Sequence, residues 1–497
     1  MLAIQTYVDK ISERSSLNRN SKGGKMTVWN NTKIIATLGP SSNTGKMIED
    51  MIVHGVDVFR LNGAHGTPDE HKETIRLIKN ISAGLKIPSA ILMDLPGPKI
   101  RVGRLKTEPL KFKCGDIVEI AFGKDRQTKD EIPIPLRGLN GSIKRGTKIY
   151  LNDGIIELVV DKVAGNRAIC RVKNGGEISS GKGVNLPNAA LKIPSLTQKD
   201  RALLNIALGE GVDYIGLSFV RSADDVAALK EIIKKSGVSV SIIAKIEKPE
   251  ALRDLDEIIT MADAIMIARG DLGIEIRHDK LPAVQRSILK KCLLKCKPSI
   301  TATQMLESMV RSKVPTRAEA SDIAMAVWEG TDALMLSSET SIGKFPLLAV
   351  KEMVKIAREA ERHMPKIDIS ELNINSDVQA ITRAAVILAQ EVGAKAIVTP
   401  TRTGRTALYV SNMRPPMQII APTEDPLTAR KMSLYWGVRP FIMPEFSTVD
   451  ELLIHAERLA LASKIIKKGD KIVTTSGAHG RKGDATRLIE VRIVGEK

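Results

Sequence analysis

The stretch EGVDYIGLS, residues 210–218, holds the pattern that decides the fold of this chain. A helix-like segment ends just before Gly211, and a short apolar run follows at once. Glycine just past a helix end supplies the left-handed conformation that caps the helix, and an apolar run of this length is typical of a buried parallel strand. The pattern therefore predicts a helix that leads directly into a strand.

The same pattern recurs along the chain. Its other copies are HGVDVFRLN from His54, MADAIMIARG from Met261, EGTDALMLS from Glu329 and VGAKAIVTP from Val392. The apolar runs up to residue 336 predict eight strands, at Lys33–Thr37, Val56–Leu61, Ala90–Asp94, Val212–Ser218, Ser239–Lys245, Ala264–Ala268, Ser299–Thr303 and Ala333–Leu336. Eight strands that alternate with helices predict an α/β fold, a closed (β/α)₈ TIM barrel.

The interval between the third and fourth runs, from Pro98 to Pro187, is longer than the others. Its segments, such as GDIVEIAFG, alternate polar and apolar residues between turns, which predicts an antiparallel β domain inserted in a barrel loop. After the eighth run, a helical stretch at Pro346–His363 and a polar linker precede a second α/β region. The predicted parts are an N-terminal extension at 1–25, the barrel at 26–97 and 188–364, an inserted antiparallel β-barrel lid at 98–187 and a C-terminal α/β domain at 365–497.

Composition and charge narrow the class of partner. A chain of 497 residues is longer than one hydrophobic core usually supports, so more than one domain is expected. Its hydrophobic content of 43% is that of an ordinary globular protein. A net charge of +18 favours anionic partners, either small phosphates or nucleic acid. An aromatic content of 3% argues against a surface that stacks single-stranded bases.

Targeting and cysteine signals are weak. The chain has no apolar run long enough to span a membrane, and Met1–Lys25 lacks the apolar core of a signal peptide. A cytoplasmic location is therefore expected, with Met26 as an alternative start.

The chain has four cysteines, Cys114, Cys170, Cys292 and Cys296. We interpret them as reduced core thiols, since no histidine lies near them in sequence to complete a metal site.

Polar side chains occupy the ends of the predicted strands, where strand propensity would not select them. They are Arg60, Asn62, Asp94, Lys245, Glu247, Arg269, Asp271 and Thr303. Reactive groups of such barrels lie at the C-terminal ends of the strands, so these residues predict a catalytic site. Taken singly, the alternatives are a solvated strand end for Lys245 and Glu247, a helix N-cap or a pair with Arg269 for Asp271, a backbone-bonded hydroxyl for Thr303, a rim salt bridge for Arg60 and a buried core histidine for His65.

From about Lys33 to near its end, the chain resembles the pyruvate kinase family. The motifs are KIIATLGPSS, FRLNGAHG, MDLPGPKIR, GKGVNLPNAALKIPSLTQKD, AKIEKPE, IMIARGDLGIEI, TATQMLESM, PTRAEASDIAMAVWEG and LSSET, in the family's order. The resemblance implies transfer of phosphoryl from phosphoenolpyruvate to ADP, giving pyruvate and ATP in glycolysis. It also implies Mg²⁺ or Mn²⁺ as cofactor and a homotetramer.

The resemblance also implies roles for the residues at the strand ends. Glu247 and Asp271 would bind the divalent metal ion, Lys245 would neutralise the phosphoryl group in flight, and Arg60 would hold its oxygens. The substrate-binding set is Arg60, Lys245, Gly270, Asp271 and Thr303, in which the Gly270 amide meets the substrate carboxylate and Thr303 helps to relay the proton to the enolate. The nucleotide-binding set is Asn62, Gly63, Ala64, His65, Arg101 and Lys182, the last two at the hinges of the lid.

Two motifs depart from those of potassium-dependent members, whose sequences at these two places resemble RMNFSHG and DTKGPEIRT. Here Ala64 replaces the serine ligand and Lys99 replaces the glutamate. The ammonium group of Lys99, at a site shared with Asn62 and Asp94, could supply the positive charge that K⁺ otherwise provides. We therefore predict activity without K⁺. Ser338, where the family usually has glycine, is expected to have little effect.

The C-terminal domain carries VTPTRTGRTA, in which hydroxyl, amide and guanidinium groups follow a strand and precede a helix. The candidate phosphate ligands are Thr401, Arg402, Thr403, Gly404, Arg405 and Thr406. The resemblance implies an allosteric phosphate site here, with Ser476–Gly483 as the facing loop. The alternative is a capped helix with solvated arginines, and a sugar bisphosphate, a sugar monophosphate and AMP all stay open as the effector.

Three rival interpretations are a barrel lyase or mutase that acts on phosphoenolpyruvate, a non-catalytic protein that binds nucleic acid, and a degenerate regulatory homologue. The lid and Lys245 argue against the first, because such enzymes need no cover for a nucleotide. The other two are disfavoured by an intact set of polar groups, namely Arg60, Lys245, Glu247, Asp271 and Thr303. We therefore expect neither a nucleic acid nor a membrane partner.

Overall fold

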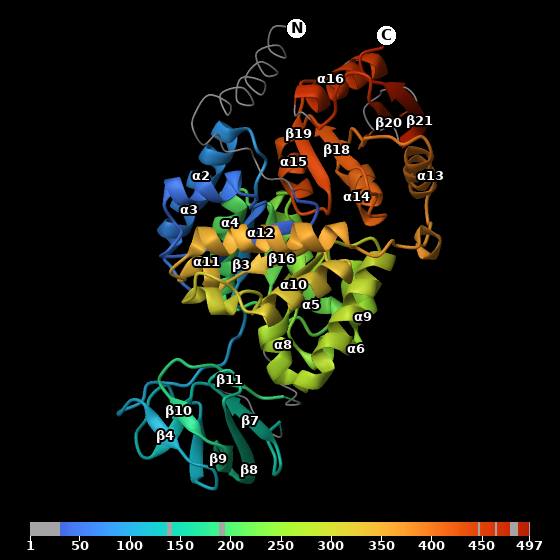
Figure 1. Cartoon of the computed structure of the whole chain (residues 1–497). Helices are drawn as coiled ribbons and strands as arrows, with labels where there is room; N and C mark the ends of the chain where they lie inside the picture. Colours follow the sequence, from blue (N-terminus) through green and yellow to red (C-terminus); the bar gives the residue numbers. More distant parts are fainter. Residues whose placement is uncertain are drawn as a thin grey trace.

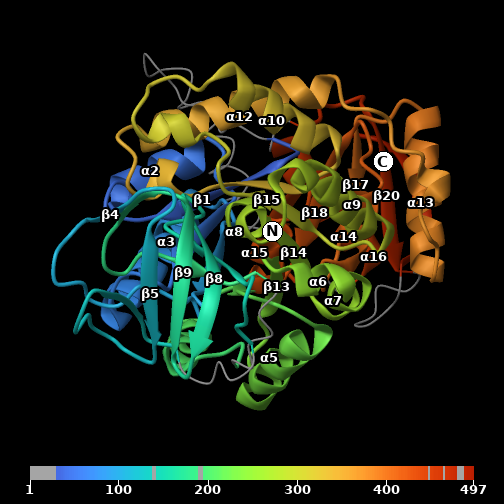
Figure 2. The ribbon, with the colours of Figure 1, turned by 90° about the horizontal axis from the view of Figure 1, so that it is seen from below.

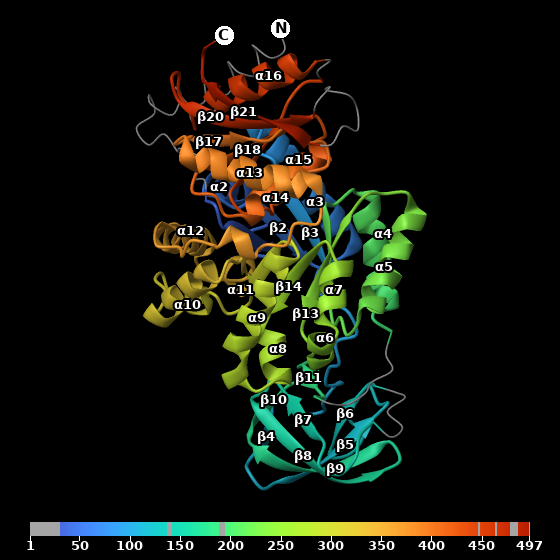
Figure 3. The ribbon, with the colours of Figure 1, turned by 90° about the vertical axis from the view of Figure 1, so that its right-hand side faces the viewer.

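The computed structural model of the chain describes residues 30–136, 142–187, 194–445, 448–462, 465–477 and 486–496. Three parts follow one another along a line, with the barrel in the middle, the inserted β domain at one end and the C-terminal domain at the other (Figure 1, Figure 3). The predicted N-terminal extension, 1–25, lies outside the described residues.

Within the described residues, eight parallel strands close into the predicted barrel, in the order β1, β2, β3, β12, β13, β14, β15 and β16. Their bounds are β1 Lys33–Leu38, β2 Val58–Asn62, β3 Ala90–Leu95, β12 Tyr214–Leu217, β13 Ser241–Ile246, β14 Ala264–Ala268, β15 Ser299–Ala302 and β16 Ala333–Leu336. The helices that surround them are α2 Gly45–Val53, α3 Pro68–Leu85, α4 Gln198–Gly209, α5 Ala223–Ser236, α6 Pro249–Arg253, α7 Leu255–Met261, α8 Arg269–Glu275, α9 Leu281–Leu294, α10 Arg317–Trp328, α11 Ser338–Ser341 and α12 Pro346–Arg362. The predicted barrel fold is confirmed.

Three strands, β2, β12 and β13, begin two residues later than the sequence suggested, and helix caps explain the first two. The backbone N–H of Val56 donates to Met51 O at 3.0 Å, and that of Val212 donates to Ala207 O at 3.1 Å. These bonds close the C-terminal turns of α2 and α4, in the way that a glycine-capped helix binds the second residue beyond its end. The apolar residue after the glycine therefore belongs to the helix cap, and the strand starts only after it.

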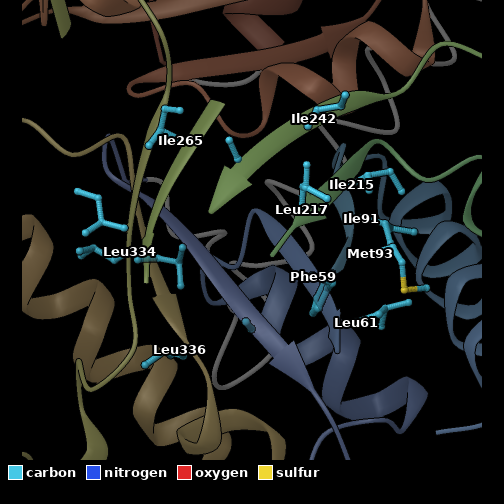
Figure 4. Packing of buried hydrophobic residues seen from close by; sticks show 14 of the residues in the cluster. Phe59, Leu61, Ile91, Met93, Ile215, Leu217, Ile242, Ile265, Leu334 and Leu336 are labelled. Carbon is cyan, nitrogen blue, oxygen red and sulfur yellow. The ribbon is translucent and has the colours of Figure 1, made fainter. Parts of the chain in front are cut away.

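Alternation along the strands sorts their side chains into two layers. Residues such as Phe59 and Leu61 point outward and pack against helix residues such as Ile75 in one apolar cluster (Figure 4). Residues such as Val58 and Leu92 fill the barrel interior in a second cluster. The same alternation turns the polar residues at the strand ends inward, toward the mouth of the barrel.

The insert is a curled sheet with strands in the order β11, β7, β8, β9, β5 and β6, beside a ribbon of β4 and β10. The bounds are β4 Leu110–Phe112, β5 Ile117–Phe122, β6 Glu131–Ile134, β7 Lys148–Leu151, β8 Ile156–Ala164, β9 Arg167–Asn174, β10 Gly176–Ile178 and β11 Val184–Asn185. The pairing is antiparallel except between β5 and β6, where the loop at 123–130 folds back to the start of β5. Glu131 fixes that loop by accepting hydrogen bonds from the N–H groups of Thr128 and Lys129, at 2.9 and 3.1 Å. Figure 2 shows this sheet in front of the barrel.

The C-terminal domain is a sheet in the order β19, β18, β17, β20 and β21, parallel except for its last pair. Its elements are α13 Asp377–Glu391, β17 Ala396–Val398, α14 Arg405–Asn412, β18 Gln418–Thr423, α15 Pro426–Met432, β19 Val438–Ile442, α16 Val449–Ala462, β20 Lys471–Gly477 and β21 Thr486–Ile493. Leu434, just after α15, inserts into the interior cluster of the barrel. Ion pairs of 2.8 and 2.9 Å join Arg430 to Asp213 and Arg414 to Asp332, and the second pair is fully buried. The domain therefore closes the barrel end opposite to the insert.

Two further expectations can be compared with the structure. Cys170 and Cys292 are buried as predicted, but Cys114 is exposed, so the interpretation of all four as core thiols is wrong for that residue. Cys114 lies in the turn between β4 and β5, which faces solvent. Among the helices of the described segments, none has the length and apolar character needed to cross a membrane.

Candidate active site at the barrel mouth

A buried carboxylate, Asp94 at the end of β3, organises the mouth of the barrel. Its Oδ2 accepts hydrogen bonds from Nε and Nη2 of Arg60, at 2.8 and 2.7 Å. Its Oδ1 lies 3.1 Å from Nζ of Lys245. Burial opposes the charge on Asp94, but Lys245 and Arg60 outweigh it and lower the pKa of this carboxyl group below its usual value. Arg60 thus forms the salt bridge that was its structural alternative, yet it does so inside the site.

Lys245 at the end of β13 uses its ammonium group fully. Nζ donates to Ser218 Oγ at 2.7 Å and contacts Glu247 Oε1 at 2.9 Å, in addition to Asp94. Burial disfavours the charge, but the two carboxylates prevail and raise the pKa of Lys245 above its usual value. The alternative of a solvated strand end for Lys245 and Glu247 is wrong, because both residues are buried.

A glycine in the neighbouring strand makes room for this cluster. Gly216 in β12 faces Asp94, and a Cβ atom there would lie 3.0 Å from Asp94 Oδ1. A side chain at this position would press on the carboxylate, so glycine in the strand interior allows the close approach.

Two carboxylates lie together on the other side of Lys245. Burial raises the pKa of Glu247 and outweighs Lys245, and the nearby Asp271 carboxylate raises it further. Like charges so placed favour a cation between them, and carboxylate oxygens are the ligands that Mg²⁺ prefers. In the described part of the chain, no group of three or more His, Cys, Asp or Glu residues could hold a metal ion. Glu247 and Asp271 alone could supply only part of the coordination of such an ion, and water and substrate oxygens would have to supply the rest.

The turn after β15 brings Thr303 to the same mouth. Thr303 Oγ1 accepts a hydrogen bond from the Gly270 N–H at 2.6 Å and donates to Ala302 O at 2.6 Å. The backbone-bonded hydroxyl that was its structural alternative is therefore present. Arg269, however, pairs with Asp322 at 2.7 Å and not with Asp271, so that predicted structural pair is wrong.

Comparison with known proteins shows to which protein family the chain with this arrangement of polar residues belongs. The family description "Pyruvate kinase, barrel domain" matches residues 29–350, and "Pyruvate kinase, alpha/beta domain" matches residues 379–491. The chain belongs to the pyruvate kinase family. It is thus an enzyme of glycolysis that transfers phosphoryl from phosphoenolpyruvate to ADP and yields pyruvate and ATP. Enzymes of this family use a divalent metal ion, Mg²⁺.

Similar curated proteins cover almost the whole chain. A pyruvate kinase of Thermococcus litoralis is 40% identical over 454 residues, which span 90% of this chain and 95% of the relative. One of Clostridium acetobutylicum is 38% identical over 471 residues, covering 93% and 99%. One of Geobacillus stearothermophilus is 38% identical over 473 residues, covering 94% and 80%.

The lid joins the pyruvate kinase barrel through two antiparallel segments that are hydrogen-bonded to each other. Val102 N donates to Lys182 O at 2.9 Å, and Arg101 pairs with Gly183 in an antiparallel bridge. At the base of the lid, Asn185 Nδ2 donates to Glu275 Oε1 of α8 at 2.9 Å. The predicted nucleotide contacts Arg101 and Lys182 are therefore exposed neighbours at one hinge.

Lys99 lies at that hinge, on the segment that leaves β3. Its Nζ is 3.3 Å from Asp271 Oδ1, and the two side chains are 33% and 27% exposed. Both oxygens of Asp94, the expected neighbour of Lys99, are in contact with Arg60 and Lys245.

The loop after β2 carries the remaining predicted nucleotide contacts. Asn62 Oδ1 accepts from Ala64 N at 3.1 Å, and Ala64 O accepts from Lys199 Nζ at 2.9 Å. Gly63 N donates to Asp94 O at 2.9 Å, which ties the loop to β3. His65 is exposed, so the alternative of a buried core histidine is wrong.

In the C-terminal domain, the predicted phosphate loop leads from β17 into α14. Thr401 Oγ1 accepts from Gly404 N at 3.0 Å, and Thr406 Oγ1 lies 2.9 Å from Thr486 Oγ1. Arg402 forms an exposed ion pair of 3.6 Å with Glu424, while Thr403 and Arg405 face solvent. Of the predicted facing loop Ser476–Gly483, residues 478–483 lie outside the described residues.

Sequence reasoning missed two residues of the site. Ser218 holds Lys245, and Glu339 accepts from Leu306 N at 3.0 Å below the turn at Thr303. Ser218 follows strand β12 directly, and this position could have identified it. Glu339 gives no such signal, because its partner is a backbone amide from another loop.

Proposed function

We propose that this member of the family transfers phosphoryl without requiring K⁺, and that Lys99 supplies the positive charge instead. The proximity of Lys99 Nζ to Asp271 Oδ1, 3.3 Å, supports this role, because it brings an ammonium group beside a proposed metal ligand. Ala64 has no hydroxyl to offer a monovalent cation. At such a distance, the interaction of two opposite charges is worth about 1–5 kcal/mol between the dielectric limits of water and a protein surface.

The residues of the mouth divide the phosphoryl transfer among them. The phosphorus–oxygen bond to the enol oxygen breaks while a bond to a terminal oxygen of ADP forms. Lys245 and Arg60 neutralise the phosphoryl oxygens, and Asp94 keeps both cations turned toward that point. Positioning and electrostatics account for most of the catalysis in such a transfer. Arg101 and Lys182 would meet the nucleotide phosphates from the lid, and the loop at 62–65 from the barrel.

Glu247 and Asp271 would hold the divalent metal ion. When bound, this ion supplies positive charge for the carboxylate and the enolate oxygen of the substrate. Glu247 is also fixed from the protein side, because its Oε2 accepts the Phe219 N–H at 2.9 Å. The carboxylate is therefore oriented before a ligand arrives.

Thr303 would relay the proton that converts enolpyruvate to pyruvate. Its hydroxyl accepts the Gly270 N–H at 2.6 Å, so this amide would have to exchange that partner to donate to the substrate carboxylate. A carbon–hydrogen bond then forms at the methylene carbon, and the proton comes from solvent through the relay.

The test replaces Lys99 by methionine, which keeps the side-chain length without the charge. Turnover of phosphoenolpyruvate and ADP with Mg²⁺ is measured in buffer free of K⁺ and Na⁺. We expect Lys99→Met to lose most of its turnover, whereas Lys72→Met, an exposed partner of Asp69, keeps it. Equal turnover in the two variants would refute the role of Lys99.

We further propose a homotetramer and an allosteric phosphate site at residues 401–406. Exposed Arg405 and Thr403 at the start of α14 support a phosphate ligand, since a helix N-terminus favours anions. A panel of sugar bisphosphates, sugar monophosphates and AMP is tested for activation of the unmodified enzyme and of Arg405→Gln. Activation that survives this substitution unchanged would contradict the proposed site.

A further inference from the structure

The turn after β15 has a backbone conformation that its residues disfavour. Thr303 has a φ of 71° and Gln304 a φ of 56°, both in the left-handed region. For a β-branched residue this is a real outlier, because the branched side chain crowds the backbone. Such strain persists only where the surroundings enforce it, and it gathers at functional sites.

The guanidinium group of Arg269 holds this turn by its carbonyl groups. Nη2 donates to Thr303 O at 2.9 Å and to Gln304 O at 3.3 Å, and Nε donates to Thr303 O at 3.3 Å. Nη1 donates to Asp322 Oδ1 in α10 at 2.8 Å. The planar fork of the guanidinium lets one side chain fix two consecutive carbonyl groups. Arg269 therefore ties the strained turn to both α8 and α10.

The hydroxyl of Thr303 is fixed by the residue that follows Arg269. The Gly270 N–H donates to Thr303 Oγ1 at 2.6 Å. Consequently the group that holds the backbone of the turn and the group that holds its hydroxyl come from consecutive residues of one short helix. A shift of the turn would separate the Thr303 hydroxyl from the Gly270 N–H, the amide proposed to meet the substrate carboxylate.

We propose that Arg269 is a positioning residue for the proton transfer, because it keeps the Thr303–Gln304 turn in its left-handed conformation. The inference rests on the proposed function, in which Thr303 relays the proton. Direct contact of Arg269 with substrate is disfavoured, since its side chain is 8% exposed and Nε, Nη1 and Nη2 are already bonded within the protein. The effect of Arg269 is therefore on the proton step and reaches it through Thr303.

The proton step can be measured apart from phosphoryl transfer. In D₂O its reverse breaks a methyl carbon–hydrogen bond of pyruvate, and the bond that re-forms takes up deuterium from the solvent. For Arg269→Gln with Mg²⁺, we expect this exchange, followed by NMR, to fall about 10²-fold, the scale of a misplaced proton-transfer group. KM for phosphoenolpyruvate stays nearly unchanged, because Arg269 does not contact the substrate.

Relief of the strain distinguishes positioning from a general structural role. Gln304 is exposed, and glycine adopts a positive φ without penalty, so Gln304→Gly removes strain with little loss of packing. Added to Arg269→Gln, it restores much of the exchange; added to the unmodified enzyme, it has little effect. If Arg269→Gln retains exchange, or if exchange, KM and melting temperature worsen together without rescue, the proposal is overturned.

Two further variants keep the result interpretable. Asp322→Asn releases the outer end of Arg269 and is expected to reduce exchange less than Arg269→Gln does, and unchanged exchange would count against the proposal even if Arg269→Gln failed to fold. Thr303→Ala tests the underlying function. Full exchange in Thr303→Ala would remove Thr303 from the relay, a failure distinct from retention of exchange in the Arg269 variant.

Discussion

Replacing Asp94 by asparagine removes the charge that joins the two cations of the site. Asp94 is 2% exposed, and its two oxygens face Arg60 at 2.7 Å and Lys245 at 3.1 Å. Asparagine fits the same space beside Gly216, so the change is one of charge and not of volume. It leaves two buried cations that repel each other.

The size of the effect follows from burial. Removing one partner of a buried ion pair costs about 3–5 kcal/mol, because the remaining charge stays out of water. With roughly 2–4 °C per kcal/mol for a domain of about 150–250 residues, the melting temperature should fall by roughly 6–20 °C at neutral pH. The matched control is Asp69→Asn, whose pair with Lys72 is exposed and worth at most about 1 kcal/mol.

The pH dependence gives the sign of the effect. Because the pKa of Asp94 is lowered in the folded state, its stabilisation is present above the usual aspartate pKa and is lost as the pH falls through the lowered value. The melting temperatures of the unmodified enzyme and Asp94→Asn should therefore stay apart from pH 7 down to about pH 4, and begin to converge only as the pH falls below that value. A gap that does not shrink as the pH falls below about 4, or one no larger at neutral pH than that of Asp69→Asn, would contradict this prediction.

Three other predictions concern the same cluster. Ser218→Ala removes a hydrogen bond to the charged Lys245, worth about 1.5–3 kcal/mol, so steady-state assays should show kcat reduced by roughly 10- to 100-fold, and an unchanged kcat would contradict this. Gly216→Ala brings a methyl group to 3.0 Å from Asp94 Oδ1 and should lower the melting temperature by the equivalent of about 1–3 kcal/mol; a melting curve like that of the unmodified enzyme would show that the strand yields. Glu247→Gln should weaken Mn²⁺ binding, titrated by electron paramagnetic resonance, by more than about tenfold, and unaltered binding would remove Glu247 from the metal site.

Much of the fold could be predicted because each βα unit repeats a local signal. A glycine cap followed by an apolar run marks both a helix end and the next strand, and the count of such runs predicted the barrel. Five of the eight barrel strands start at the predicted residue, but β2, β12 and β13 start later. Val56 and Val212 are as apolar as the strand residues, but they close helices, and only the hydrogen bonds to Met51 and Ala207 reveal it.

The site was predictable where chemistry and strand position coincide. Arg60, Asp94 and Lys245 end apolar strands, and alternation turns all three inward to meet at Asp94. Contacts between distant loops gave no signal of this kind. The hydrogen bonds from Arg269 to the turn depend on the positive φ of Thr303 and Gln304, which the sequence TATQM does not predict.

The most direct test of the account is the turnover of the unmodified enzyme with phosphoenolpyruvate, ADP and Mg²⁺ in a buffer that contains neither K⁺ nor Na⁺. With Lys99 beside Asp271, adding K⁺ should leave this turnover essentially unchanged. Loss of most turnover without K⁺, and its recovery when K⁺ is added, would contradict the proposal that the ammonium group of Lys99 replaces the monovalent ion.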